Sequence, residues 1–186
     1  IESSPGALLI YNQNLPKDRS PKLLGINPGA SYGSSKKWYP REFALVATHL
    51  SKKYDIIIFG GAAEKNMAAD IEKYLNQNGV ENYENLAGKT SISSLIRKIA
   101  TLDLFITGDS GPMHVASAFQ IPTISIFGPT NDKETSQWKN EKSFIVKKNL
   151  ECQPCMKRTC PLSHHDCMKL IKPEDVMIAV EAVNDL

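Results

Sequence analysis

Short apolar runs rich in β-branched residues alternate along this chain with segments whose apolar residues recur at helical spacing. This alternation is typical of a parallel β-sheet whose strands are connected by crossover helices. Strands are expected at 22–27, 56–59, 104–107, 123–127 and 144–147. The pattern therefore predicts an α/β protein with a Rossmann-like, doubly wound parallel sheet.

The expected helices are defined by their apolar faces and by the residues at their ends. A helix is expected over 40–53, which opens with a proline and carries apolar residues at helical spacing. A second helix ends at Asn78-Gly79, because glycine readily adopts the backbone conformation that closes a helix. The remaining helices are expected with Ile92, Leu95, Ile96 and Ile99 on a buried face, at 112–119, and from Pro173 onward.

Length and charge limit the domain organisation and the partners. The chain has 186 residues, which suits one domain over 22–186 preceded by a lead-in or interdomain segment over 1–21. The net charge is +2 without long blocks of like charge, so nucleic acid is not expected as a partner. No apolar run approaches the ~18 residues of a membrane span. Because the sequence does not start with methionine, we expect a piece of a longer protein.

Ligands of open parallel sheets bind at the carboxyl ends of the strands, so the loops that leave the strands are the candidate sites. Three of these loops, at 27–38, 59–64 and 107–116, are rich in glycine and polar residues. In the third loop, Gly111 and Pro112 open a helix whose free N–H groups suit a phosphate. The sequence therefore predicts an anion site at this helix terminus.

Polar side chains from the neighbouring loop complete this predicted site. Lysine binds phosphate as a point charge, so Lys36 is expected to close over the anion, with Ser31 as an additional donor. A carboxylate would repel the phosphate, so Asp109 is expected to contact a sugar hydroxyl instead. Other interpretations are that the glycine pairs are plain turns, that Trp38 belongs to the core, and that His114 is packed or faces solvent.

Four cysteines fall within one short window: Cys152, Cys155, Cys160 and Cys167. This clustering indicates thiols in a reducing compartment rather than disulfides distributed over a small secreted fold. Two interpretations stay open. The thiols either remain reduced and pack the loop against the last helix, or they form a tetrahedral Zn²⁺ site with His164 and His165 as further ligands.

Six short motifs follow the strands and open the helices: Asn27-Pro-Gly-Ala, Lys36-Lys-Trp38 followed by Pro40, Phe59-Gly-Gly-Ala, Leu86-Ala-Gly-Lys-Thr90, Asp109-Ser-Gly-Pro-Met-His-Val-Ala116 and Ile126-Phe-Gly-Pro-Thr130. Taken together, these motifs resemble the bacterial heptosyltransferases of glycosyltransferase family nine. The resemblance extends over about 22–183, nearly the whole chain. The cysteine segment is most similar to the heptosyltransferase II branch of that family.

The resemblance implies the C-terminal half of a GT-B fold. Residues 22–186 would form a domain that binds ADP-heptose, with a cysteine-rich loop at 152–167 and a C-terminal helix. The implied donor-binding residues are Ser31, Lys36 and the amides of Ser110 and Gly111 for the diphosphate, Asp109 for the heptose, Glu64 for the ribose, Thr90 beside the adenine, and His114 in support of the loop.

The resemblance also implies an inverting transfer of heptose to the inner core of lipopolysaccharide or lipooligosaccharide, with no required cofactor and no metal. The lipid A–core acceptor and the general base would belong to an N-terminal domain, so this half is expected to be inactive alone. The implied location is cytoplasmic, peripheral to the inner membrane. Two alternatives come from other classes: half of a GT-B-like sugar-nucleotide epimerase, which would bind a uridine nucleotide, and a zinc-binding interaction module.

Overall fold

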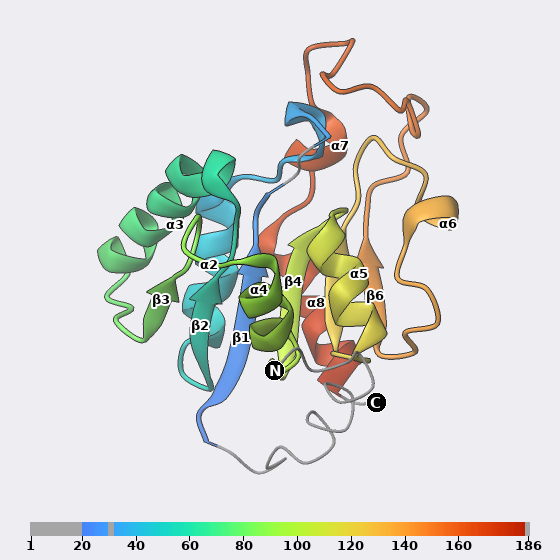
Figure 1. The fold of residues 1–186 in the computed structure, drawn as a ribbon. Helices are drawn as coiled ribbons and strands as arrows, with labels where there is room; N and C mark the ends of the chain where they lie inside the picture. The colour runs from blue at the N-terminus through green and yellow to red at the C-terminus, as the bar shows by residue number, and fades with distance from the viewer. Residues whose placement is uncertain (1–19, 30–31, 185–186) are drawn as a thin grey trace.

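The structure is a computed structural model that describes residues 20–29 and 32–184, and its centre is a six-stranded sheet (Figure 1). The strands are β1 (Lys22–Asn27), β2 (Tyr54–Ile58), β3 (Tyr83–Asn85), β4 (Leu104–Gly108), β5 (Thr123–Ile126) and β6 (Ser143–Val146). All pairs are parallel, in the order β3-β2-β1-β4-β5-β6. The predicted doubly wound Rossmann-like fold is confirmed, and its strand order reverses between β1 and β4.

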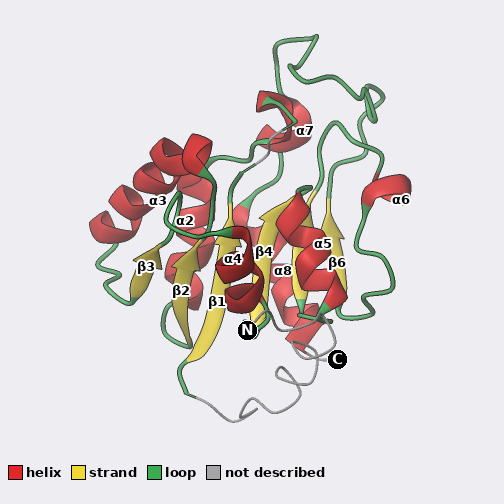
Figure 2. Ribbon diagram, in the orientation of Figure 1, coloured by secondary structure: helices red, strands yellow, loops and turns green. Residues whose placement is uncertain are grey.

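Helices connect the strands and flank the sheet (Figure 2). They are α2 (Pro40–Leu50), α3 (Lys65–Gln77), α4 (Ile92–Ile99), α5 (Gly111–Ala118), α6 (Asp132–Thr135), α7 (Asp166–Lys169) and α8 (Pro173–Asn184), together with the 3-10 turns η1 (Ser34–Lys36) and η2 (Ala62–Glu64). The left-handed conformation expected at the end of α3 is present at Gly79, whose φ is 72°.

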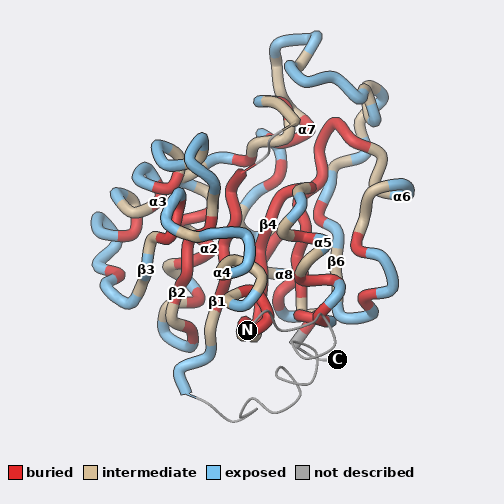
Figure 3. The backbone as a smooth tube through the Cα atoms, viewed as in Figure 1, coloured by how far each residue is buried: buried red, intermediate tan, exposed pale blue. Residues whose placement is uncertain are grey.

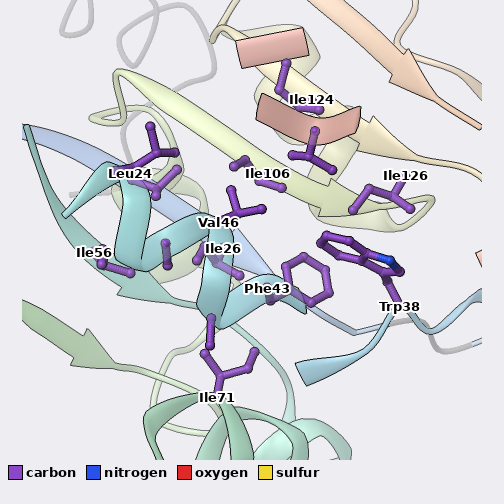
Figure 4. Close-up of a cluster of buried hydrophobic side chains, with 14 of the residues drawn as sticks. Leu24, Ile26, Trp38, Phe43, Val46, Ile56, Ile71, Ile106, Ile124 and Ile126 are labelled. Carbon is purple, nitrogen blue, oxygen red and sulfur yellow. The ribbon is translucent and has the colours of Figure 1, made fainter. Parts of the chain in front are cut away.

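Each face of the sheet packs against its own group of helices. Successive strand residues point to opposite faces, so Leu24 and Ile26 of β1 face α2, α3 and α8, whereas Phe105 of β4 faces α4 and α5. Figure 4 shows the first of these clusters, which contains the fully buried Trp38, so the interpretation of Trp38 as a core residue is confirmed. Its indole Nε1 donates to the carbonyl oxygen of Ile171 at 3.1 Å. Burial of each large apolar side chain contributes roughly 1.5–3 kcal/mol.

Some details differ from the sequence-based expectation. Strand β3 was not expected, because its three residues, Tyr83–Asn85, are polar or half-exposed at the edge of the sheet. Helix α2 ends at Leu50 rather than at 53. Ile92 was expected on the buried face of α4 but is 79% exposed, because it stands on the first turn of that helix, outside the packed cluster.

The carboxyl ends of all six strands form one edge of the sheet. At this edge Figure 1 shows the cysteine-containing segment, residues 152–167, beside α7. Figure 3 shows that burial is concentrated in the strands, whereas this segment is mostly exposed or half-buried. In the described part of the chain, no helix is long and apolar enough to cross a membrane. The proposed boundary at residue 22 coincides with the start of β1, while residues 1–19 lie outside the described residues.

Candidate functional site at the switch point of the sheet

The site lies where the strand order reverses, between the carboxyl ends of β1 and β4. The side-chain amide of Asn27, the last residue of β1, donates to the hydroxyl oxygens of Thr107 at 3.2 Å and Ser110 at 3.1 Å. This amide therefore ties β1 to the N-terminus of α5. Because the Ser110 hydroxyl is held by Asn27, it does not cap the helix.

The N-terminus of α5 faces open space. Gly111 is exposed, and a methyl group added at its Cα would meet nothing within 4 Å. Pro112 has no N–H group, so the Gly111 amide is the main donor at the start of the helix. A helix N-terminus carries roughly half a positive charge, so this location favours a negatively charged group.

Lys36 and Asp109 form a nearly buried ion pair beside this helix terminus. The Lys36 Nζ lies 2.6 Å from Asp109 Oδ2, and the two side chains are 11% and 6% exposed. Lys36 belongs to η1, so the loop after β1 and the loop after β4 meet through this pair. The sequence-based prediction placed both residues at the site, with Lys36 against the phosphate and Asp109 against a sugar hydroxyl. The structure shows that they also contact each other.

Two threonines complete the surroundings of Asp109, and the sequence-based prediction assigned neither of them. The Thr130 hydroxyl donates to Asp109 Oδ2 at 2.6 Å, and the Thr135 hydroxyl does so at 3.4 Å. All three side-chain donors thus converge on Oδ2. None of the described residues donates to Oδ1.

The segment that contains the cysteines packs directly onto the loop that carries Lys36. The Ser35 N–H donates to the Arg158 carbonyl oxygen at 3.1 Å, and the Ser35 hydroxyl donates to the carbonyl of Lys157. A side chain at Gly33 would overlap the Arg158 carbonyl, so glycine is required there by this close approach. From the other end of the segment, His165 Nε2 lies 2.8 Å from the Ser35 carbonyl oxygen. The position of Lys36 therefore depends on this segment.

Glu64 and Thr90 lie on the β2–β3 side of the same edge. The Glu64 Oε2 accepts the Gly61 N–H at 2.8 Å, and a Cβ added at Gly29 would lie 2.6 Å from Glu64 Cγ. Glu64 therefore stands between the ends of β1 and β2. Thr90 is half-buried in the following loop, which is held against β2 by a 2.8 Å bond from the Gly88 N–H to the Gly60 carbonyl.

The structure thus groups the candidate residues in two parts. Lys36, Asp109, Ser110 and Gly111 meet at the switch point, and Glu64 and Thr90 lie on the neighbouring strand ends. His114 is exposed on α5. Ser31 lies outside the described residues. The specific ligand contacts of all eight residues stay predictions.

The cysteine side chains surround one cavity of about 20 Å³, together with Ser35 and His164. All four thiols are free. The Zn²⁺ interpretation requires three or four ligands at bonding distance from one point. Within residues 20–29 and 32–184, no three His, Cys, Asp or Glu side chains are arranged so that they could hold a metal ion. We therefore derive no step through a metal at this cluster.

Burial, together with smaller contributions from the thiols of Cys155, Cys160 and Cys152, raises the pKa of the Cys167 thiol to about 11. The ordinary value is 9.0. Burial likewise raises the pKa of the Tyr39 hydroxyl, with a further contribution from Cys167; this hydroxyl lies 3.0 Å from His165 Nδ1. These thiols are therefore close enough to interact electrostatically, and Cys167 is the buried member of the cluster.

We expect Cys167 to be alkylated more slowly than the other three cysteines at pH 8. The thiolate is the reactive form, and a pKa of about 11 leaves Cys167 almost entirely protonated at that pH. Its rate should rise steeply as the pH approaches 11. Iodoacetamide labelling followed by peptide mass spectrometry measures all four rates in one sample. Equal rates at all four positions, in a chain shown to be folded by circular dichroism, would contradict the assigned burial of Cys167.

Comparisons with known proteins show the family and the fold of the chain. Residues 8–165 match the family described as glycosyltransferase family 9 (heptosyltransferase). The chain is 48% identical over 157 residues to the lipooligosaccharide heptosyltransferase 2 of Campylobacter jejuni, covering 84% of this chain and 49% of that protein. The chain therefore spans about half the length of the curated relatives that it matches.

Solved structures show the same fold. The E. coli ADP-heptose LPS heptosyltransferase II is similar with a TM-score of 0.72 and 25% identity, over 98% of this chain and 52% of that one. The E. coli heptosyltransferase WaaC with ADP has a TM-score of 0.70 at 17% identity, over 95% of this chain and 49% of that one. At that identity the second likeness supports the fold alone.

Proposed function

The chain belongs to glycosyltransferase family 9, the heptosyltransferases, and from this premise we propose that it is the donor-binding half of a GT-B enzyme. The reaction is an inverting transfer of heptose from ADP-heptose to the inner core of lipopolysaccharide or lipooligosaccharide. The single observation that carries this proposal is the buried Lys36–Asp109 pair beside the open N-terminus of α5. Such a pair offers a cation for a diphosphate and an acceptor for a sugar hydroxyl in one place.

In this proposal the donor diphosphate lies over the Gly111 amide and within reach of Lys36 Nζ, with Ser31 and the Ser110 amide as further donors. As the glycosidic bond breaks, negative charge develops on the departing ADP. Donors that already point at that charge stabilise the transition state without reorganising. Two contacts support this role, because they hold the loop after β4 in position before a ligand arrives: the Asn27 amide donates to the Ser110 hydroxyl, and the Thr130 hydroxyl donates to Asp109 Oδ2.

We propose that Asp109 Oδ1 accepts a hydrogen bond from a hydroxyl of the sugar. Asp109 Oδ2 already accepts from Lys36 and Thr130, so Oδ1 is the oxygen that we propose accepts from a heptose hydroxyl. Glu64, at the neighbouring strand end, is proposed to contact the ribose, and Thr90 to lie beside the adenine. His114, exposed on α5, is proposed to support the loop. The donor would then extend along the carboxyl edge from β4 to β3.

The remaining parts of the reaction belong to the other half of such an enzyme. We propose that an N-terminal domain binds the lipid A–core acceptor and supplies the general base, and that the enzyme works in the cytoplasm at the inner membrane surface. Nucleic acid has no place in the proposal, and the reaction needs no cofactor. The four cysteines are proposed to pack the loop as reduced thiols. Metal analysis of the purified protein tests the zinc-module alternative.

We expect the chain to bind ADP about tenfold more tightly than UDP. An adenine pocket offers hydrogen-bonding groups that uracil leaves unpaired, at a cost of about 1–3 kcal/mol. Isothermal titration calorimetry of the chain with each nucleotide measures the ratio, and adenosine and uridine serve as uncharged controls. Equal or tighter binding of UDP would contradict the proposal and favour the epimerase alternative.

A further inference from the structure

Tyr32 contacts two cations that come from distant parts of the chain. The Lys36 ammonium lies 4.8 Å from the centre of its ring, and the Arg158 guanidinium carbon lies 5.4 Å from it. The Tyr32 hydroxyl donates to the Met156 carbonyl at 2.8 Å, which fixes the ring to the cysteine-containing segment. Both cations are therefore held against one ring at the edge of the proposed diphosphate site.

These two cations differ in what else they contact. The charge of Lys36 is balanced by Asp109 at 2.6 Å, so the pair contributes little net positive charge to an incoming anion. Arg158 is exposed, and no carboxylate of the described residues lies within ion-pair distance of it. A diphosphate bears at least two negative charges. Lys36 and the helix terminus alone leave much of that charge unbalanced.

The backbone around Arg158 is anchored on both sides of the site. Its carbonyl accepts the Ser35 N–H, which ties it to the loop of Lys36. Two residues earlier, the Met156 N–H donates to the Pro129 carbonyl at 2.9 Å, next to Thr130, the partner of Asp109. The segment thus bridges the loops after β1 and β5. The Arg158 side chain extends from a fixed base and loses little backbone freedom when it binds.

We propose that Arg158 is a second cation for the diphosphate of the sugar nucleotide, brought to the site by the cysteine-containing segment. This inference rests on the proposed function and adds a binding residue to it. The planar guanidinium matches two phosphate oxygens at once, which a lysine ammonium does not. The cysteine-containing segment would then do two things in donor binding: it positions Lys36 through Ser35, and it supplies the positive charge of Arg158.

The test compares Arg158→Gln with Lys157→Gln by calorimetry, using ADP and adenosine as probes. Lys157 is the matched control, because it is the neighbouring exposed cation. In the described part of the chain, the cations over the Tyr32 ring are Lys36 and Arg158, and Lys157 is not one of them. Arg158→Gln is expected to weaken the binding of ADP at least tenfold and the binding of adenosine less than twofold, because one charge-assisted contact to phosphate is lost. Lys157→Gln should change ADP affinity less than threefold. Arg158→Lys should fall between the wild type and Arg158→Gln.

Three results would overturn the inference. If the wild type binds ADP and Arg158→Gln binds it equally well, Arg158 is not a ligand, and the proposed function is untouched. If adenosine weakens as much as ADP, Arg158 acts by holding the loop rather than by binding phosphate. If the wild-type chain does not bind ADP at all, the proposed function and this inference fall together. Thermal unfolding of each variant confirms that the compared chains are folded.

Discussion

Replacing Lys36 with methionine is expected to weaken ADP binding about a hundredfold while leaving adenosine binding nearly unchanged. Methionine keeps most of the length and apolar volume of the lysine side chain but removes its charge. Two effects add in this variant. The diphosphate loses a charge-assisted contact, and Asp109 keeps its negative charge beside the phosphate without its 2.6 Å partner. Calorimetry with ADP, AMP and adenosine measures how much of the loss in affinity depends on the charge of the ligand.

Asp109→Asn and the double variant provide the controls for this prediction. Asparagine can still accept from Thr130 but no longer balances Lys36, so this variant should bind ADP at least as tightly as the wild type. It should lose the preference for ADP-heptose over ADP, because the proposed sugar contact is weakened. The double variant should bind ADP more tightly than Lys36→Met alone, since no unpaired carboxylate faces the phosphate. A double variant that bound ADP no more tightly than Lys36→Met alone would contradict a role for the pair as one unit.

The same pair bears on stability. Both side chains are nearly buried, and removing one partner of a buried ion pair leaves a charge without compensation, at a cost of about 3–5 kcal/mol. Lys36→Met is therefore expected to be less stable than the double variant. Chemical denaturation measures this order independently of any ligand. The ligand results should be compared only at temperatures where all variants are folded.

The sheet was largely predictable from the sequence because its strands are buried on both faces. Leu24 of β1 and Phe105 of β4 pack against opposite helix layers, so both faces of the central strands are buried and these strands contain short apolar runs. The prediction failed where burial is one-sided or absent. Tyr83–Asn85 forms an edge strand without an apolar run. Ile92 is an apolar residue, but it is exposed on the first turn of its helix.

The site was predictable only in part. Residues that follow strands in a parallel sheet must meet at its carboxyl edge, so Lys36 and Asp109 could be placed together from the topology. Their direct pairing, and the hydroxyl of Thr130 on the same oxygen, depend on side-chain geometry that no spacing rule describes. Thr130 did belong to a motif that ends a strand, and that position was the available signal. Arg158 lies in an irregular loop, where periodicity carries no information.

The last prediction concerns transfer itself: this chain alone is expected to convert ADP-heptose and acceptor at least about 10⁴-fold more slowly than a complete enzyme. An inverting transfer needs a base within reach of the acceptor hydroxyl. The two carboxylates at the site are already engaged, because Asp109 accepts from Lys36 and Thr130, and Glu64 accepts the Gly61 N–H. Both are proposed to contact the donor, Asp109 through the heptose and Glu64 through the ribose, so we expect the base to come from the other half of the enzyme.

The experiment measures ADP release from ADP-heptose and acceptor by the chain alone, with the full-length Campylobacter jejuni relative as positive control, because this chain spans about half of that protein. A second arm adds the separately expressed half of the relative that this chain does not cover. Oriented contact between bound reactants contributes about 7–11 kcal/mol, so restoring the acceptor half should raise the rate by orders of magnitude if the two halves associate. Asp109→Asn is also measured in the chain alone, without the added half. If the chain alone turned over at the rate of the control, and Asp109→Asn abolished that turnover, then Asp109 would be the base, and the division of donor and acceptor chemistry between two domains would be wrong.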